Sequence, residues 1–528
     1  MVSLVHELIH TAASKCPAAI ALRDGRSELS YATLSAEVNR AADLLLGLGL
    51  SRGERVAVYM DKRVDTVVAM FGAAAAGGVF VPVNPLLKAA QVAYILQDCN
   101  VRVLVTSAER LAALTPVLAD CHDLRAVVLV SDAAAPVLER MDCVNWSDRA
   151  DAGPAVAHRV IDGDMAAILY TSGSTGRPKG VVLSHRNLVA GARSVSQYLE
   201  IDAADRILSV LPLSFDYGLN QITSAFYTGA CAVLMNYLFP RDVIRMVERE
   251  KITGLAAVPP LWIQLAQLDW PPAITEHLRY FTNSGGAMPL PTLAALREKL
   301  PTTRPYLMYG LTEAFRSTYL PPEQADIRPG SIGRAIPDAE ILVVRADGTP
   351  CAPGEEGELV HRGVHVSLGY WNDAAKTAER FRPAPGQPAG LVMPEIAVWS
   401  GDTVKRDEEG YLYFVGRRDE MIKTSGYRVS PSEVEEVVYA SGLVVEAVAL
   451  GVAHPVLGQA VVLVVYAPAQ DATVADRLLN ECKLKLPAFM IPARIEVKSD
   501  PLPRNPNGKI DRVQLSAGLA DLFKETPA

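Results

Sequence analysis

The stretch Leu169-Tyr-Thr-Ser-Gly-Ser-Thr-Gly-Arg-Pro-Lys-Gly-Val-Val-Leu-Ser-His185 decides the fold. It interleaves three glycines with serines, threonines and a single lysine, Lys179. The apolar run 165–170 predicts a buried strand before it, and Ser184 predicts the N-cap of a helix over 186–199. Glycine lets the backbone approach a ligand closely, and a loop that aims N–H groups and hydroxyls at one point binds anions. The stretch therefore predicts a polyphosphate-binding loop.

The spacing within this loop excludes two familiar sites. A Walker A loop needs G-x-x-x-x-G-K-[ST], whereas Arg177 and Pro178 separate Gly176 from Lys179 here. The loop also lacks the G-x-S-x-G pattern of a nucleophilic serine. A solvated Gly/Ser loop is the plain alternative, and the lysine and hydroxyls placed among the glycines argue against it.

Length and composition indicate a multidomain globular enzyme. At 528 residues the chain is too long for one hydrophobic core. Its hydrophobic fraction of 50% and charged fraction of 21% are typical of globular proteins. The net charge of −8, with no basic block, disfavours nucleic acid as a partner. The seven cysteines form no C-x-x-C pair, so we expect free thiols in a reducing cytoplasm.

No segment of the sequence predicts a signal peptide or a membrane span. Acidic and histidine residues interrupt the apolar pattern of residues 1–15, which predicts an amphipathic helix. The longest uncharged run, 66–87, is broken by Gly77-Gly78 and Pro82. A span needs about 20 continuous apolar residues. We therefore expect a cytoplasmic protein.

Alternating helix and strand patterns over residues 1–160 predict an α/β fold with helices on both faces of a sheet. The expected strands are 55–59, 79–82, 101–106 and 126–130, the expected helices are 31–48, 64–76 and 90–99, and 131–160 is a polar connection. Short strands and Gly/Pro/Asp turns from 326 onwards predict a β-rich subdomain over about 326–418. We expect a large N-terminal domain of stacked α/β sheets, 1–418, and a small α+β domain, 419–528.

Further glycine-rich turns follow predicted strands. They are Asn283-Ser-Gly-Gly-Ala-Met-Pro289 and Tyr306-Leu-Met-Tyr-Gly-Leu-Thr-Glu-Ala314. A third strand, within 207–212, runs into a segment in which Asp216 sits among aromatic residues. Ligands bind at the carboxyl ends of strands in α/β sheets. These turns are therefore candidates for one shared site.

Seven motifs in order resemble those of the adenylate-forming superfamily, which includes acyl-CoA synthetases, the adenylation domains of nonribosomal peptide synthetases and firefly-type luciferases. They cover nearly the whole chain. They are the phosphate loop, Ser284-Gly-Gly-Ala287, Tyr309-Gly-Leu-Thr-Glu313, Trp399-Ser-Gly-Asp402, Gly416-Arg417, the hinge position Asp419 and Pro506-Asn-Gly-Lys509.

The resemblance implies a role for each motif. The loop residues Thr171, Ser172, Gly173, Ser174, Thr175, Gly176 and Lys179 would bind the β- and γ-phosphates of ATP. Gly285, Gly286 and Ala287 would lie against the adenine, Tyr309 would be a further cofactor-binding residue, and Asp402 and Arg417 would bind the ribose. Thr312 would meet the α-phosphate, Glu313 would hold Mg²⁺, and Lys509 would be the catalytic lysine.

The implied chemistry explains these residue types. A carboxylate attacks the α-phosphate of ATP and becomes an acyl-adenylate, with release of pyrophosphate. Two anions meet in this step, so catalysis rests on positioning and positive charge. The family's small domain then rotates about the hinge, Asp419. The rotation removes Lys509 and brings Lys423 and Gly426 to the thiol, although Lys423 is also explained as a surface lysine.

The substrate pocket is the least determined part of the sequence. Ser214-Phe-Asp-Tyr217 resembles the motif whose aspartate pairs with the α-ammonium of an amino acid. The pocket positions carried over are Asp216, Tyr217, Asn220, Thr282, Ser284, Met308 and Arg316. This polar set disfavours a long fatty chain. If Asp216 and Arg316 do not simply pair with each other, they indicate an amino acid or another polar, even dicarboxylic, acid.

The thiol acceptor is also left open. After residue 512 there is no Asp-Ser-Leu phosphopantetheine site, so the acceptor is free CoA or a separate carrier protein. The phosphate loop favours CoA, and a stand-alone amino-acid adenylation enzyme that loads a carrier is the alternative. A non-catalytic nucleotide or acyl sensor would be expected to lack Lys509 or Glu313, and both are present. A luciferase-like oxygenase shares the adenylation motifs and stays open.

Overall fold

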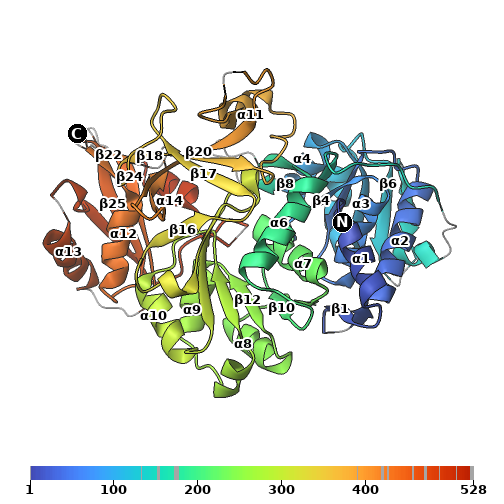
Figure 1. Ribbon diagram of the computed structural model, residues 1–528, viewed down its shortest axis with the longest axis horizontal. Coiled ribbons are helices and arrows are strands. Elements are labelled where there is room, and N and C mark those ends of the chain that lie inside the picture. Colours follow the sequence, from blue (N-terminus) through green and yellow to red (C-terminus); the bar gives the residue numbers. More distant parts are fainter. Residues whose placement is uncertain are drawn as a thin grey trace.

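The computed structural model describes residues 2–25, 27–131, 134–138, 140–150, 155–171, 178–388, 390–417, 421–424, 427–454, 457–468, 473–486, 488–506 and 508–523. Three sheets with flanking helices make up the molecule (Figure 1). The helices are α1 Glu7–Lys15, α2 Tyr31–Gly47, α3 Val64–Ala75, α4 Ala89–Asp98, α5 Ala108–Leu118, α6 His185–Tyr198, α7 Asp216–Thr228, α8 Pro240–Arg249, α9 Pro259–Ala266, α10 Leu290–Lys299, α11 Ala374–Arg380, α12 Pro431–Ala440, α13 Val474–Lys485 and α14 Arg512–Gly518.

The seven-stranded sheet carries the phosphate loop at one edge. Its order is β7 (Asp142–Asn145), β6 (Ala126–Val130), β5 (Val101–Ser107), β3 (Arg55–Tyr59), β4 (Val79–Pro82), β8 (Met165–Thr171) and β9 (Lys179–Ser184). All neighbours are parallel except β8 and β9. Val56 and Val58 of β3 face one hydrophobic core, and Ala57 and Tyr59 face another. This alternation is the period of two that buries both faces of a strand.

The largest sheet joins a parallel half to an antiparallel half. Its order is β17 (Ala339–Val344), β18 (Glu356–Gly363), β20 (Ile396–Arg406), β21 (Leu412–Arg417), β16 (Ser331–Ala335), β15 (Thr318–Leu320), β14 (Arg304–Tyr309), β13 (Tyr280–Asn283), β12 (Gly254–Ala257), β10 (Arg206–Ser209), β11 (Cys231–Leu234), β1 (Ile20–Arg23) and β2 (Glu28–Ser30), with β19 (Phe381–Pro383) beside β20. The strands from β15 to β21 pair antiparallel.

One continuous core lies between these two sheets. It joins Phe80 of β4 and Leu208 of β10 through helical residues such as Phe71 of α3 and Phe226 of α7, whose rings meet edge to face. Figure 1 shows α6 and α7 in the middle of the molecule, between the blue and the yellow-green sheets. Because the helices of this layer are buried from two sides, they hold the ends of both sheets in a fixed relation.

The C-terminal part is a separate α+β unit. Its sheet has the order β23 (Tyr427–Val429), β22 (Ile422–Thr424), β25 (Gly458–Tyr466) and β24 (Glu446–His454), with β26 (Arg494–Lys498) beside β25. One face packs on α12 and α13, and Leu515 of α14 packs against the other. The predicted α/β fold, with a large domain of several sheets and a small α+β domain, is confirmed.

Two elements near the site were not predicted, for identifiable reasons. Helix α7 is buried from Asp216 to Phe226, so its residues lack the amphipathic period that reveals a surface helix. Strand β9 falls within the stretch that the sequence predicts as loop. It pairs with β8 on one side, and on the other side its backbone exchanges hydrogen bonds with Leu368 and Gly369, which are remote in sequence.

Two smaller differences concern caps and connections. The region 131–160 contains β7 and a short 3₁₀ helix, Trp146–Ala150, rather than a plain connection. The sequence Ser430-Pro-Ser-Glu433 predicts a capped helix start. Helix α12 does begin at Pro431, but the Ser430 hydroxyl donates to the carbonyl of Val415 and does not cap the helix. Ser184 does cap α6, through the N–H of Asn187.

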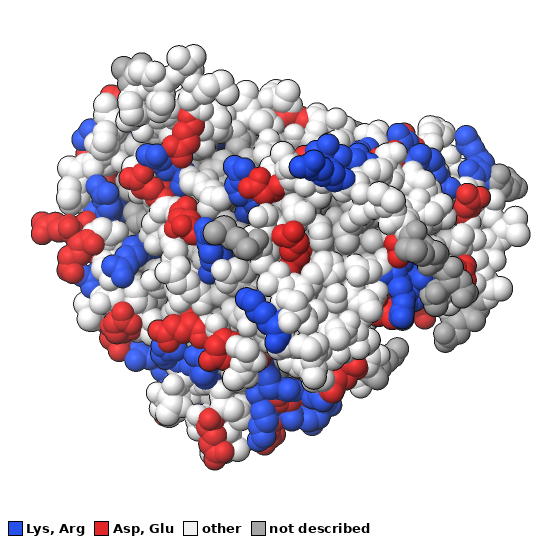
Figure 2. Space-filling view, turned by 45° about the vertical axis from the view of Figure 1, so that its right-hand side comes forward, with Lys and Arg blue, Asp and Glu red and all other residues white. Residues whose placement is uncertain are grey.

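The molecular surface carries charges of both signs. Figure 2 shows Lys and Arg side chains interspersed with Asp and Glu across the face in view, without one field of a single sign. No helix in the described residues is long and apolar enough to cross a bilayer.

Candidate active site

A β-hairpin supports the two ends of the phosphate loop. Thr171, the last residue of β8, pairs with Lys179, the first residue of β9. The predicted phosphate ligands Ser172, Gly173, Ser174, Thr175 and Gly176 lie outside the described residues. The Lys179 ammonium lies 4.8 Å from the centre of the Tyr370 ring. The hairpin therefore places this lysine over an aromatic face beside the loop.

Tyr370 also contacts the predicted metal ligand. Its hydroxyl donates a 2.6 Å hydrogen bond to Oε1 of Glu313, which lies in the 3₁₀ turn Thr312–Ala314. A bridge to Val181 of β9 fixes the Tyr370 backbone. Burial and the Glu313 carboxylate both raise the pKa of Tyr370, so the phenol stays protonated and remains a donor. Tyr370 belongs to none of the predicted motifs, although it follows Gly369 in the aromatic pair Tyr370-Trp371.

Asp216 lies at the start of α7, next to Thr312. The Thr312 hydroxyl is 3.4 Å from Oδ1 of Asp216. The turn into α7 requires a glycine at 218, since a Cβ there would come within 2.1 Å of the Pro212 carbonyl oxygen. Asp216 is 3% exposed, so the fold buries a carboxylate beside the predicted α-phosphate contact.

Arg316 supplies the counter-charge to Asp216. Its Nη1 is 3.7 Å from Oδ2 of Asp216, and its guanidinium lies 4.5 Å over the ring of Tyr217. Arg316 is 2% exposed, and its backbone has φ of +112°, a region that side chains other than glycine rarely occupy. Its Nε and Nη2 have no hydrogen-bond partner among the residues that the structure describes. Asp216 and Arg316 therefore pair with each other, which is the simpler of the two sequence expectations, but the pair leaves two guanidinium nitrogens without a partner in the described residues.

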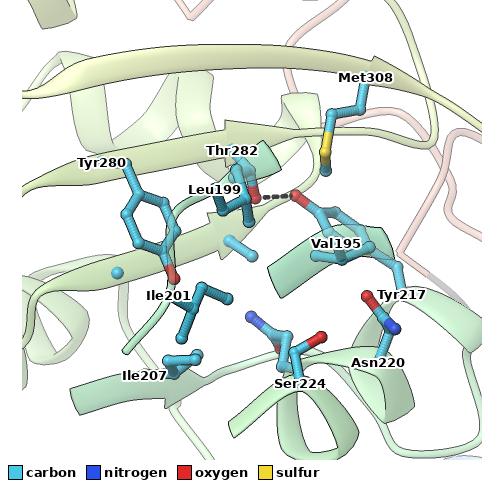
Figure 3. Close-up of a pocket in the computed structure, with 13 residues that line it drawn as sticks. Val195, Leu199, Ile201, Ile207, Tyr217, Asn220, Ser224, Tyr280, Thr282 and Met308 are labelled. Carbon is cyan, nitrogen blue, oxygen red and sulfur yellow. Dashed lines mark hydrogen bonds between the residues drawn. The ribbon is translucent and has the colours of Figure 1, made fainter. Parts of the chain in front are cut away.

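A small pocket lies beyond Tyr217, between α7, the end of α6 and the parallel strands. Figure 3 shows the Tyr217 hydroxyl directed at Thr282, and their oxygens are 2.5 Å apart. Four predicted pocket residues line the cavity, namely Tyr217, Asn220, Thr282 and Met308. The buried residues Ser284, Asp216 and Arg316 are not part of its lining. Sequence reasoning missed the other wall, which is Val195, Leu199, Ile201, Ile207, Gln221, Ser224, Gly254, Ala256 and Tyr280.

The cavity wall is apolar with a few polar atoms. Asn220 Nδ2, Gln221 Oε1 and Ser224 Oγ are buried and have no hydrogen-bond partner in the described part of the chain. All three belong to α7, and Figure 3 shows Asn220 and Ser224 side by side on that helix. A polar ligand group at this position would satisfy these atoms.

The turn Ser284–Ala287 faces the loop that carries Lys509. Gly285 has φ of +82°, and a Cβ built there would lie 3.1 Å from Cε of Lys509. The Lys509 ammonium is 5.6 Å from the centre of the Phe215 ring, and Phe215 directly precedes Asp216. The C-terminal unit therefore brings its lysine to the turns that carry Asp216 and Gly285. Gly286 and Ala287 are exposed at the tip of the turn.

Asp402 is anchored on the β-rich subdomain. The Tyr309 hydroxyl donates a 2.5 Å hydrogen bond to its Oδ2, and β20 pairs Asp402 with Arg417 of β21. The N–H of Asp402 is bound by the Ser400 hydroxyl at 3.0 Å. The Arg417 side chain lies outside the described set. The backbone nevertheless brings two predicted ribose residues opposite each other.

Two family matches cover most of the chain. Residues 9–371 match the AMP-binding enzyme family, and residues 433–509 match the AMP-binding enzyme C-terminal domain. The chain belongs to the AMP-binding enzymes. It is an adenylate-forming ligase, and it shares the α/β fold and the small C-terminal domain of that superfamily.

Individual relatives of this adenylate-forming ligase differ in their acceptors. The chain is 32% identical to an L-proline–[L-prolyl-carrier protein] ligase of Pseudomonas fluorescens, over 97% of this chain and 99% of the relative. ATP-bound MatB from Rhodopseudomonas palustris superposes with a TM-score of 0.86 at 26% identity, covering 98% of this chain and all of that one. A benzoate CoA ligase from Burkholderia xenovorans LB400 has a TM-score of 0.84 at 25% identity, with coverage of 98% and 100%.

The adenylate-forming ligase offers a fitting position for Mg²⁺ at Glu313. A carboxylate has about four acceptor sites, and Tyr370 uses one of those on Glu313. No group of three or more His, Cys, Asp or Glu side chains in the described ranges could form a metal cage. Mg²⁺ usually takes one or two carboxylates together with substrate phosphates, so a single oriented glutamate fits it.

The residues expected to act in thioester formation are described in part. Lys423 lies in β22, paired with Arg428 of β23, and its side chain is outside the described set. Asp419, the predicted hinge, and Gly426 also lie outside the described residues. In the described arrangement, Lys509 of the small C-terminal domain faces the glycine turn at Gly285 of the large domain.

Proposed function

We propose that the protein converts a compact polar carboxylic acid into its acyl-adenylate and then transfers the acyl group to a phosphopantetheine thiol. The contact between the Lys509 loop and the turns that carry Gly285 and Asp216 carries this proposal. A flexible cation from one domain thus lies beside the turns that we propose to bind the adenosine and the substrate acid in the other. A group of this kind can neutralise the charge that builds when two anions react.

The first step joins the acid to the nucleotide. A carboxylate oxygen attacks the α-phosphorus of ATP, and the bond from that phosphorus to the bridging oxygen of pyrophosphate breaks. Lys509 would contact the incoming carboxylate and the bridging oxygen, and Thr312 would donate to the α-phosphate. Lys179 would hold the terminal phosphates beside the loop. Mg²⁺ bound at Glu313 would supply further positive charge to the phosphates.

The second step releases AMP. The thiol sulfur attacks the acyl carbon and loses its proton, and the bond between that carbon and the phosphate oxygen breaks. Lys509 has no part in this step. Lys423 and Gly426 are the residues we propose for the thiol side, as the family resemblance implies, with Asp419 as the hinge between the two arrangements.

The ion pair of Asp216 and Arg316, next to Tyr217 of the pocket wall, favours a polar acid with a second acceptor group, and a dicarboxylic acid above all. Asp216 already lies at ion-pair distance from Arg316, so its charge is compensated without an α-ammonium. Two nitrogens of Arg316 have no acceptor among the residues that the structure describes, and a buried unsatisfied donor costs about 1–3 kcal/mol. A substrate carboxylate, keto or amide oxygen would remove that cost. An α-ammonium would instead approach a buried guanidinium.

An amino acid is the second candidate substrate. The relative from Pseudomonas fluorescens is a proline-activating ligase, and Asp216 stands in the Phe215-Asp216 motif of amino-acid adenylation domains. Asp216 has two oxygens, so one could meet an ammonium while the other faces Arg316. The two candidate substrates predict different effects of Arg316→Gln on the exchange reaction.

ATP–pyrophosphate exchange against malonate, succinate, proline, aspartate, benzoate and octanoate tests this assignment. We expect exchange with a dicarboxylate, a loss of about 10²–10³-fold in Lys509→Ala, and a rise in KM in Arg316→Gln. Exchange with proline that persists in Arg316→Gln would support the amino acid instead. Exchange with octanoate alone would contradict both candidates.

A carrier protein is the acceptor we favour. The carrier-dependent proline ligase aligns over nearly its whole length, at higher identity than the benzoate CoA ligase. CoA is the second candidate, because that CoA ligase superposes over the full chain and because the phosphate loop resembles those of CoA ligases.

Pantetheine and CoA distinguish the two acceptors. An enzyme built for CoA uses the binding energy of the nucleotide part, so its kcat/KM for CoA should exceed that for pantetheine by about 100-fold. A carrier-loading enzyme should have similar kcat/KM values for CoA and pantetheine. The comparison uses the wild-type protein and the acid that supports exchange. Mass spectrometry measures the rate of thioester formation with each thiol.

A further inference from the structure

Asn84 joins the large domain to the loop that carries Lys509. It follows β4 and is 5% exposed. Its side-chain Nδ2 donates a 2.6 Å hydrogen bond to the carbonyl of Pro506, three residues before Lys509. The two residues are more than four hundred positions apart, and none of the motifs that the reaction uses includes Asn84. This bond therefore adds an unassigned contact between the two parts of the enzyme.

The large domain holds Asn84 in place independently of Pro506. Its Oδ1 accepts a 2.9 Å hydrogen bond from the N–H of Leu86, and its backbone carbonyl accepts from Leu87 at 3.1 Å. One side of the amide thus anchors the side chain in its own turn, and the Nδ2 side is directed outward. A pre-oriented donor loses little side-chain entropy when it binds a partner.

The Lys509 loop is likewise shaped within its own domain. The buried Glu446 binds the N–H of Leu502 at 2.8 Å and pairs with Arg504, which in turn donates to the carbonyl of Gly508 at 3.1 Å. Asn505 closes the loop through Oδ1, which accepts from the N–H of Lys509 at 3.1 Å. These bonds keep the loop's shape wherever the domain lies. They do not determine where on the large domain the loop sits.

We propose that Asn84 is a positioning residue for the adenylation step, because it anchors the Lys509 loop at the Gly285 turn. This inference rests on the proposed function, in which Lys509 serves adenylation and not thioester formation. The bond to Pro506 exists only while the loop occupies its present place. It therefore favours that arrangement over any other arrangement of the two domains. Loss of a hydrogen bond of ordinary strength would lower the ratio of that arrangement to all others by about 5-fold.

Asn84→Asp tests the proposal with almost no change of shape. The aspartate keeps an oxygen for the Leu86 N–H and replaces the donor with an oxygen that faces the Pro506 carbonyl. We expect the kcat/KM of ATP–pyrophosphate exchange to fall by about 10-fold. Thioester formation from synthetic acyl-adenylate and pantetheine should stay within about 2-fold of wild type.

Asn236→Asp is the matched control. Asn236 Nδ2 donates a 2.6 Å bond to the backbone carbonyl of Lys62, so this amide makes the same kind of bond within the large domain. Any loss caused by the isosteric change alone should lower both half-reactions alike in this variant. A merely structural role of Asn84 would lower both half-reactions. A decrease of exchange without a decrease of thioester formation in Asn84→Asp therefore indicates a positioning role.

Trypsin cleavage after Lys509 gives a second measurement that needs no activity. The Lys509–Ile510 bond lies in the docked loop, so its cleavage rate should rise about 5-fold in Asn84→Asp and stay unchanged in Asn236→Asp. Equal rates of cleavage, or equal losses in both half-reactions, would overturn the role of Asn84. Absence of exchange in the wild-type protein with every acid would contradict the proposed function instead, and the cleavage rates would still decide the docking.

Discussion

The Tyr370 hydroxyl donates a 2.6 Å hydrogen bond to Oε1 of Glu313, and the same ring carries the Lys179 ammonium 4.8 Å from its centre. One side chain thus contacts the carboxylate proposed to hold Mg²⁺ and the cation proposed to hold the terminal phosphates. Its ring and its hydroxyl act separately, because the cation lies over the ring and the carboxylate accepts from the oxygen. A change that removes the oxygen alone can separate the two contributions.

We expect Tyr370→Phe to raise the Mg²⁺ concentration needed for half-maximal exchange and to lower kcat by about 10-fold. A hydrogen bond to a charged group contributes about 1.5–3 kcal/mol, and the phenylalanine keeps the ring beneath Lys179. A Mg²⁺ titration of ATP–pyrophosphate exchange measures both. Tyr413→Phe is the control, because the Tyr413 hydroxyl binds Asp407, away from the site, at 3.3 Å. An unchanged Mg²⁺ dependence in Tyr370→Phe would contradict the orienting role.

Gly285→Ala should impair adenylation by displacing Lys509. The position has φ of +82°, and the added methyl would lie 3.1 Å from Cε of Lys509 and 3.4 Å from Cγ1 of Val258. The strained backbone costs on the order of 1 kcal/mol, and the lysine must move to make room. We expect exchange to fall about 10-fold or more.

The control for this substitution is Gly442→Ala. Gly442 has φ of +68° and open space around its Cβ position, so it reports the backbone cost alone. Equal losses of exchange in the two variants would show that strain, and not the Lys509 contact, explains the effect.

Lys62 should make the stability of the protein rise with pH above neutrality. Its ammonium is buried and donates to the carbonyls of Ser209 and Leu211, and burial lowers the pKa of Lys62 to about 7. Between pH 7 and 10.5 the unfolded chain holds a proton that the folded protein lacks, so folding is favoured as the pH rises. The free energy of unfolding should increase by up to about 1.4 kcal/mol per pH unit.

Thermal unfolding of wild type and Lys62→Met between pH 7 and 9.5 measures this linkage. The difference in Tm between the two proteins should shift in favour of wild type as the pH rises, because methionine cannot titrate. A constant difference would mean that Lys62 stays protonated in the folded protein.

The motifs identified residues that are distant in the sequence and that the fold brings together. Gly285 and Lys509 are over two hundred residues apart, and each was identified from its own short motif. Short motifs report the local backbone and chemistry of one turn, which is why the turns could be found. The fold class followed from alternating apolar patterns in the same way, since those patterns report which faces are buried.

Contacts between turns were harder to predict because no local pattern encodes them. The pairing of Asp216 with Arg316 was left open, since it depends on the unusual backbone at residue 316 as well as on the start of α7. Tyr370 was missed because its hydroxyl gains a function only where the fold places Glu313. Helix α7 was missed because it is buried on all sides. The part of the pocket wall formed by Ile201 and Tyr280 was not predicted, because these are ordinary core residues by sequence.

The His185 ring predicts acid sensitivity in the contact between the N-terminal segment and α6. Its Nδ1 accepts a 3.1 Å hydrogen bond from the N–H of Val5, which requires that nitrogen to be unprotonated. Burial lowers the pKa of His185 to about 4, although the carboxylates of Asp164, Glu7 and Asp162 favour its charged form. The ring of His6, whose pKa is also lowered to about 4 by burial and by His185, lies 6.1 Å away.

The sign of the effect follows from these directions. Above about pH 6.5 the ring is neutral in both the folded and the unfolded protein, and its full contribution to stability is present. As the pH falls from 6.5 to 4, the unfolded chain binds a proton that the folded ring does not, so up to about 3 kcal/mol is lost. His185→Gln keeps an acceptor for Val5 and removes the titration. Its Tm should therefore fall less than that of wild type between pH 6.5 and 4.5, and parallel curves would show that other groups govern the acid range.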